Sequence, residues 1–230
     1  MRDPFKIEGP ALISFSGGRT SGYMLWRILQ AHGGILPKDV HTVFANTGKE
    51  MLETLEFVQL CSEHWNVHIE WLEYQASETP SDRWTAVTYW NASKKGEPFK
   101  ELIRAKQYLP NPVTRFCTIE LKIRPMKFFA KHMGFEDWSV AIGLRADEQS
   151  RVAKSRARSG HEGWDNLMPL ADAGITKRDV EAFWRKQNFG LNCRQSTALR
   201  HSATATSASS SPPPRSAASC ATYPPAHSGG

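Results

Sequence analysis

At 230 residues the chain is long enough for one α/β domain with an appendage, or for two small domains. Its 40% hydrophobic content supplies a core, no apolar run approaches the length of a membrane span, and the apolar N-terminal stretch of a signal peptide is missing, so we expect a cytoplasmic protein. The formal charge of +6 gives nucleic-acid binding only weak support, because residues 192–230 contribute three arginines and no acidic residue, which leaves 26 basic against 23 acidic groups in residues 1–191.

Apolar runs and amphipathic stretches alternate along the first third of the chain. The pattern predicts strands at 11–15, 41–45 and 68–72, separated by helices at 20–32 and 50–64. Strands that alternate with helices in this way are typical of βαβ units around a parallel sheet.

The rest of the folded region continues this pattern after an interruption. Residues 77–112 are less periodic and are predicted to be an insertion with a helix near 99–107. A fourth strand is expected at 139–143 and a short fifth at 167–170, and a final helix runs from Thr176, its N-cap, to Gln187. We therefore predict an α/β fold with a doubly wound, mostly parallel five-stranded sheet and helices on both faces.

The composition changes abruptly after about Leu191. From Asn192 onward the chain has 9 Ser, 8 Ala, 5 Pro and 4 Thr and no Lys, Ile, Val, Met, Phe or Trp, which predicts a disordered low-complexity tail after a domain of residues 1–191. The alternative hypothesis is a frameshift near Asn192, since the shifted reading frame permits a helix-periodic, charge-balanced string that contains C-x-x-C. DNA codons incompatible with that string would refute the frameshift.

A glycine-rich hexapeptide lies directly between the first predicted strand and helix; it reads Ser16-Gly17-Gly18-Arg19-Thr20-Ser21. Two glycines let backbone N–H groups approach an anion closely, and the following helix adds its positive N-terminal end. The hexapeptide therefore predicts a phosphate-binding loop, with an ordinary Gly-Gly turn as the alternative. It is neither a Walker A loop nor a G-x-G-x-x-G motif.

The hexapeptide resembles the PP-loop of the adenine nucleotide α-hydrolase superfamily, and further stretches resemble its PAPS reductase branch. These stretches, which follow in order over roughly residues 10–187, are Phe44–Glu50 with Glu53–Phe57, Arg115–Thr118 with Lys122 and Pro125, Gly143–Arg151, and Pro169-Leu170 with Thr176, Asp179 and Val180. The resemblance implies an adenine nucleotide, either PAPS or ATP, as the ligand, with Mg²⁺ if ATP is used.

The resemblance assigns nucleotide-binding roles beyond the loop. Asn46, Thr47 and Gly48 follow the second strand and would line the adenine or ribose, with helix capping as the alternative for Thr47. Further candidates for nucleotide binding are Lys122, Gly143, Arg145, Glu148 and Arg151. The arginines and the lysine suit phosphate or sulfate, and Glu148 would orient Arg145 or bind a metal. The alternative for Arg151 is a solvated basic face shared with Lys154, Arg156 and Arg158.

Cys117 is the candidate catalytic thiol or metal ligand, with a small buried hydrophobe as its alternative role. The resemblance allows an iron–sulfur cluster or zinc only with a native C-terminus that supplies the partners of Cys117, because the written chain contains no C-x-x-C. Cys61 lies on an apolar helical face and is predicted to be in the core.

Three functions follow from the resemblance and from the residues. The first is a PAPS reductase-like oxidoreductase or transferase, in which a thiol donor such as thioredoxin supports sulfite release. The second is an ATP pyrophosphatase-type enzyme that adenylates an acceptor during sulfur transfer to nucleic acid. The third is a non-catalytic nucleotide- or DNA-binding module. A true frameshift would leave nucleotide binding but remove the thiolate-bearing end.

Overall fold

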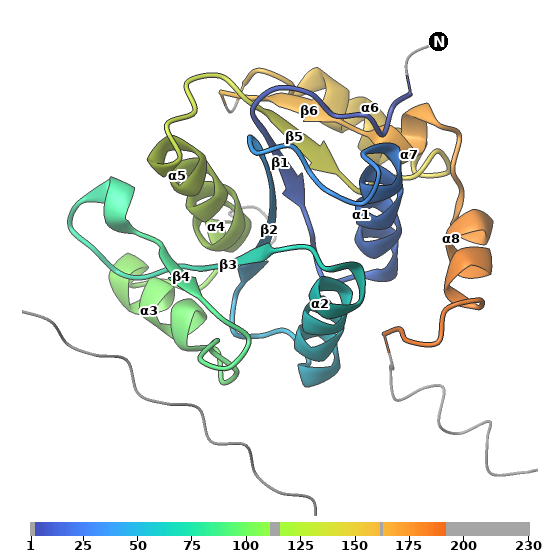
Figure 1. The fold of residues 1–230 in the computed structure, drawn as a ribbon. Helices are drawn as coiled ribbons and strands as arrows, with labels where there is room; N and C mark the ends of the chain where they lie inside the picture. The colour runs from blue at the N-terminus through green and yellow to red at the C-terminus, as the bar shows by residue number, and fades with distance from the viewer. Residues whose placement is uncertain (1–2, 111–115, 162, 192–230) are drawn as a thin grey trace, which may run out of the picture. The chain divides into compact units, whose positions relative to one another are not determined.

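The computed structural model describes residues 3–110, 116–161 and 163–191 (Figure 1). These residues build one six-stranded sheet in the order β4-β3-β2-β1-β5-β6. Its strands are β1 (Ala11–Ser14), β2 (Val40–Asn46), β3 (Ile69–Glu73), β4 (Thr85–Val87), β5 (Ser139–Ile142) and β6 (Asp165–Leu167). All neighbouring pairs are parallel except β3 and β4, which are antiparallel. The predicted α/β class with a mostly parallel sheet is confirmed.

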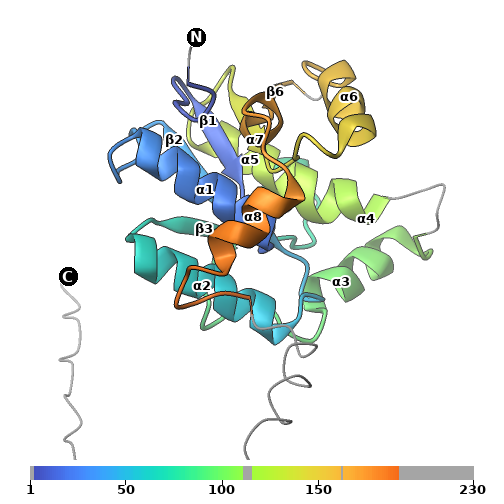
Figure 2. The same ribbon diagram turned by 90° about the vertical axis from the view of Figure 1, so that its right-hand side faces the viewer.

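The helices lie on both faces of this sheet. They are α1 (Arg19–Ala31), α2 (Leu52–Trp65), α3 (Glu97–Lys106), α4 (Phe116–Thr118), α5 (Arg124–His132), α6 (Gln149–Ala157), α7 (Pro169–Asp172) and α8 (Lys177–Trp184), with the 3₁₀ turn η1 (Pro80–Asp82) and the π-helical η2 (Ile119–Ile123). On one face of the sheet, Ala11 and Ile13 of β1 pack in an apolar cluster with residues of α1, α2 and α8. On the other face, Leu12, which lies between them in the sequence, packs in a second cluster with residues of α5. Figure 2 shows α8 beside α1, where Phe183 contacts Tyr23 and Trp26. The period of two along β1 thus gives each face its own core.

The insertion supplies the strand that the five-stranded prediction did not include. Strand β4 lies within residues 77–112 and pairs antiparallel with β3 at the edge of the sheet. The expected helix near 99–107 is present as α3, which begins two residues earlier. The predicted helix is therefore confirmed, and the sheet has six strands rather than five.

One predicted strand is displaced, and two helical segments were not predicted. The fifth predicted strand at 167–170 is displaced, because β6 ends at Leu167 and Pro169 begins α7. Proline lacks the N–H that a strand ladder needs and suits the first turn of a helix, which explains the shift. The continuous helix α4-η2-α5 and helix α6 were not predicted from the sequence.

The C-terminal helix forms as expected. Thr176 is the N-cap of α8, and its backbone N–H and hydroxyl both donate to Asp179, at 2.8 and 2.6 Å. This reciprocal capping box confirms the predicted start. The described residues fall within one compact unit, Met1–Cys193, and no helix among them has the length and apolarity to cross a bilayer. The predicted tail and frameshift lie outside the described residues.

Candidate active site

The glycine-rich loop turns tightly between β1 and α1. Gly17 has φ +72, and a Cβ added there would lie 2.6 Å from Thr54 Cγ2 and 3.2 Å from the ring of Phe44. Because an L-residue strains this backbone and no space remains for a side chain, position 17 requires glycine. The close contact also fixes the loop against β2 and α2.

Ser21 closes the loop from the first turn of α1. Its Oγ receives the backbone N–H of Ser16 at 3.2 Å and of Gly18 at 3.3 Å, and it donates to the Gly18 carbonyl at 2.9 Å. Ser21 is only 3% exposed, so its hydroxyl shapes the loop from inside while Ser16 and Arg19 face solvent. The hexapeptide is thus a preformed turn at the positive end of a helix, which is the geometry that phosphate binding needs.

The end of β5 meets this loop directly. A Cβ at Gly143 would lie 3.2 Å from the Cα of Ser21, so glycine permits the close approach. Beyond it, Arg145 donates from Nη1 to the Thr20 hydroxyl at 3.1 Å and from Nε to Asp147 at 3.0 Å. The hydrogen bond from Arg145 holds the pKa of Asp147 below its usual value. A largely buried guanidinium is therefore held beside the glycine-rich loop.

Glu148 connects Arg145 with Arg151. One of its oxygens accepts from the Arg145 backbone N–H at 3.1 Å and lies 3.4 Å from the Arg145 Nη1, and the other pairs with Arg151. The structure thus brings together the loop, Arg145, Glu148 and Arg151 as one hydrogen-bonded group, with Gly143 packed against Ser21.

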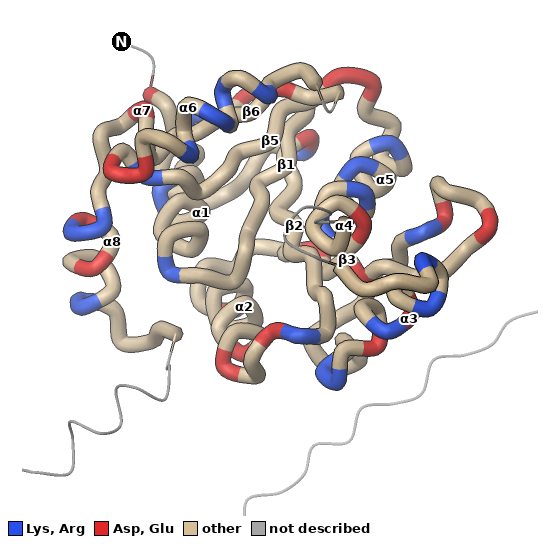
Figure 3. Tube along the Cα trace, turned by 180° about the vertical axis from the view of Figure 1, so that it is seen from behind, with Lys and Arg blue, Asp and Glu red and all other residues tan. Residues whose placement is uncertain are grey.

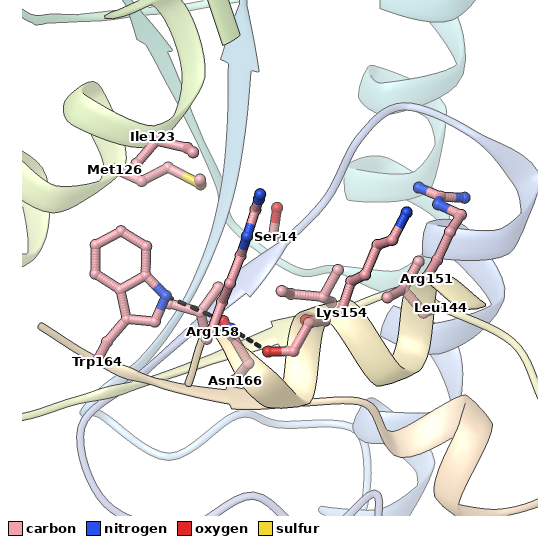
Figure 4. Close-up of a pocket in the computed structure, with 12 residues that line it drawn as sticks. Ser14, Ile123, Met126, Leu144, Arg151, Lys154, Arg158, Trp164 and Asn166 are labelled. Atoms are coloured by element: carbon pink, nitrogen blue, oxygen red, sulfur yellow. Dashed lines mark hydrogen bonds between the residues drawn. The ribbon is translucent and has the colours of Figure 1, made fainter. Parts of the chain in front are cut away.

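A cavity of about 530 Å³ lies over the carboxyl ends of β1 and β5, between α5 and α6 (Figure 4). Its lining comprises Ser14, Ile123, Met126, Val140, Ile142, Leu144, Arg151, Lys154, Ser155, Arg158, Trp164 and Asn166. Three cationic side chains reach it from α6 and its C-terminal end, and no carboxylate lines it. We call this cavity the basic pocket. A pocket with three positive charges, no negative one and an apolar wall suits an anionic ligand of nucleotide size.

Sequence reasoning placed only one of these cations in the site. Lys154 and Arg158 were read with Arg151 as a possible solvated face, but their spacing of i, i+3 and i+7 puts all three on one side of α6, as Figure 4 shows. Arg156 lies elsewhere and pairs with Asp172 at 2.7 Å. The helical spacing was the signal that could have separated them. Figure 3 shows the basic segments along α5 and α6 from behind.

The loop after β2 forms a second hydrogen-bonded group. Glu50 accepts from the Thr47 backbone N–H at 2.9 Å and from its hydroxyl at 2.8 Å, and lies 3.5 Å from Lys122 Nζ. Asn46 is fully buried and accepts the Gly48 backbone N–H at 3.1 Å. Thr47 does not cap α2, whose N-cap is Met51. Lys122 and residues 46–48 therefore lie together at the end of β2, next to the strand that carries the phosphate loop.

Cys117 lies apart from the basic pocket. It is half-buried against an apolar cluster that contains Tyr74, Leu102 and Phe116. Cys61 is in the core, as expected, and burial raises the pKa of its thiol far above the usual range. Within residues 3–110, 116–161 and 163–191, no group of three or more His, Cys, Asp or Glu side chains is placed to hold a metal ion. Within these residues Cys117 therefore has no set of partners that could hold zinc or a cluster with it.

A comparison against protein families identifies the family of the chain. Residues 10–193 match the phosphoadenosine phosphosulfate reductase domain. The chain belongs to this family. The match confirms the resemblance to the PAPS reductase branch that the sequence motifs indicated. The match covers every described candidate site residue.

Two curated relatives extend the comparison. The chain is 32% identical over 187 residues to the uncharacterized nin region protein ORF290 of Escherichia phage lambda, a match that covers 78% of this chain and 60% of the relative. It is 30% identical over 153 residues to an uncharacterized protein of Methanocaldococcus jannaschii, covering 66% of this chain and 26% of that protein. The chain therefore spans less than two thirds of the length of either relative.

Solved structures resemble the chain only distantly. The PAPS reductase of Candida auris, in a phosphate complex, is 14% identical with a TM-score of 0.48, over 86% of this chain and 85% of that one. The U34-tRNA thiolase NcsA of Methanococcus maripaludis, with its [4Fe-4S] cluster, is 12% identical with a TM-score of 0.47, over 80% of this chain and 61% of that one. At this level of similarity, the two structures do not indicate the substrate of this chain.

Proposed function

We propose that the protein binds an adenine nucleotide with two separate anionic groups and acts on a sulfonucleotide of the PAPS type. The observation that carries the proposal is the basic pocket next to the phosphate loop. The loop with Arg145 offers one place for an anion, and Arg151, Lys154 and Arg158 offer another. A nucleotide with a single phosphate chain would leave Lys154 and Arg158 without an anionic group from the ligand, while Arg151 keeps its pair with Glu148.

The two anion sites are joined but distinct. Glu148 pairs with both Arg145 and Arg151, so it marks the boundary between the loop and the basic pocket. The 5′ phosphosulfate would lie on the loop amides and Arg145, and the 3′ phosphate in the basic pocket. Adenine or ribose would face residues 46–48, at the end of the strand beside the loop.

The proposed reaction takes place at the sulfur of this ligand, in two steps. A thiolate attacks the sulfur, the bond between sulfur and the 5′ phosphate oxygen breaks, and the nucleotide leaves as a 3′,5′-bisphosphate. A second thiol then displaces sulfite and leaves a disulfide, so the electrons come from the thiol pair of a donor such as thioredoxin. The loop amides and Arg145 would stabilise the charge that develops on the departing phosphate.

A second candidate is pyrophosphate release from ATP with transfer of AMP to an acceptor. The position of Cys117 in an apolar cluster, rather than in the basic pocket, favours it, since this reaction requires no thiol from the described residues. Pyrophosphate would then leave from the phosphate loop. Mg²⁺ would have to arrive with the ATP.

One set of assays separates the candidates. The protein is incubated with PAPS and reduced thioredoxin, and separately with ATP and Mg²⁺, and both sulfite and pyrophosphate are measured. Sulfite supports the first candidate and pyrophosphate the second, whereas binding without either product supports a non-catalytic module. By calorimetry, adenosine 3′,5′-bisphosphate should bind at least about tenfold more tightly than AMP, because charge-assisted hydrogen bonds are worth about 1.5–3 kcal/mol. Equal affinities would contradict the role of the basic pocket.

A further inference from the structure

A buried carboxylate lies behind the loop after β2 and has no part in the reaction proposed above. Glu73 ends β3, is 5% exposed, and accepts three hydrogen bonds. Asn46 Nδ2 donates to its Oε1 at 2.6 Å, and Ser93 donates its backbone N–H to Oε1 and its hydroxyl to Oε2, both at 2.7 Å. A carboxylate buried at this depth is costly unless its oxygens are satisfied, and here both are.

The partners of Glu73 come from two different parts of the chain. Asn46 is its register partner on β2, and Ser93 belongs to the insertion. The second amide hydrogen of Asn46 goes to the Ser93 carbonyl at 2.9 Å, and its Oδ1 takes the Gly48 backbone N–H at 3.1 Å. Every polar atom of the Asn46 side chain is therefore used to join the insertion to the loop of residues 46–48.

The same loop touches the insertion through its backbone. Gly48 has φ +72, and a Cβ built on it would lie 3.0 Å from the Gly96 Cα and from Pro98 Cδ. Backbone approach this close requires both segments to be held accurately. Glu73 sets the position of Ser93, three residues before Gly96, so it determines where the insertion meets the loop.

We infer that Glu73 is a positioning residue for the nucleoside half of the ligand. It fixes Asn46 and Ser93, and through them the loop that would contact adenine or ribose, while the phosphate loop keeps its own separate support from Ser21 and Thr54. This inference rests on the proposed function. It implies that the two halves of the nucleotide depend on different residues.

Calorimetry on the full chain tests the two halves of the nucleotide site separately. AMP is the probe for the nucleoside half, and inorganic pyrophosphate is the probe for the phosphate loop. Glu73→Ala should weaken AMP binding by about tenfold or more, since three donors lose their acceptor, and change pyrophosphate binding by less than about twofold. Glu73→Gln should restore AMP binding to within about threefold, because an amide oxygen can replace Oε1 and the Ser93 hydroxyl can turn to accept. Glu70→Gln is the matched control on the same strand, where Glu70 pairs with the exposed His68.

If Glu73→Ala binds AMP as the wild type does, or loses both probes equally while folded, the positioning role is wrong. If Glu73→Ala does not fold, Ser93→Ala, which removes only the hydroxyl bond, should weaken AMP alone by about threefold, and unchanged AMP affinity would overturn the inference. A wild-type protein that binds neither probe refutes the proposed function, and the inference with it. A wild-type protein that binds both, with no split in the variants, refutes the inference alone.

Discussion

The phosphate loop and the basic pocket are neighbours at the carboxyl ends of β1 and β5, yet they are assembled differently. The loop is six consecutive residues whose shape is set by Gly17 and by hydrogen bonds to Ser21. The basic pocket draws its walls from β1, β5, α5, α6 and β6, so its charges become a site only after the chain has folded. A binding element of the first kind can be read from a short motif, whereas one of the second kind cannot. The predictions that follow test this difference.

The largest effect is expected at Gly17. Gly17→Ala places a methyl group 2.6 Å from Thr54 Cγ2 at φ +72, so unfolding in urea should show a loss of about 2–5 kcal/mol and phosphate binding should disappear. Gly18→Ala is the control, because its φ is −107 and the nearest atom to its Cβ is 3.7 Å away. Equal damage from both substitutions would show that the loop does not depend on this one backbone position.

The basic pocket is tested by the double substitution Lys154→Met with Arg158→Met. It should lower affinity for adenosine 3′,5′-bisphosphate by about 10- to 100-fold and leave AMP affinity and folding nearly unchanged, since both side chains line the cavity and both residues are exposed rather than part of the core. Arg156→Met serves as the control, as its side chain pairs with Asp172 outside the basic pocket. A parallel loss of AMP affinity in calorimetry would mean that the pocket and the loop are not separate sites.

A smaller effect tests whether the loop has tertiary support as well. The Trp184 indole N–H donates to the Arg19 carbonyl at 2.8 Å, at the first residue of α1. Trp184→Phe should therefore lower the melting temperature by about 2–4 °C, for a loss of about 1 kcal/mol. Trp138→Phe should cost less, because the buried Trp138 N–H has no partner among the described residues. The opposite order would contradict a role for the α8 contact.

The smallest effect is expected at the start of α8. Thr176→Ala removes the N-cap and should cost about 1 kcal/mol, without changing ligand affinity. The bonds from Thr176 lower the pKa of Asp179, so their stabilisation is present above the ordinary carboxyl pKa and is lost as the pH falls through the lowered value. The difference between the melting temperatures of wild type and variant should thus narrow in acid. A difference that stays constant down to low pH would show that the bond from the Thr176 hydroxyl to the Asp179 carboxylate contributes nothing.

Features that are set by residues close together in the chain were predicted from the sequence, whereas features that are set by tertiary packing were missed. The capping box at Thr176 and the tight turn at Gly17 follow from residues within a few positions of one another. The edge strand β4 did not, because three residues with an irregular pattern become a strand only by pairing with β3. Glu73 was missed for the same reason, since its partners are 27 and 20 residues away.

Leu191, the last described residue, is bonded through its carbonyl to the Arg19 guanidinium at 3.0 Å. The segment after α8 is therefore tethered at the first residue of α1, next to the glycine-rich loop. Local opening of this contact would release the start of α1 and residue 191 together, so their backbone amides should exchange at similar rates.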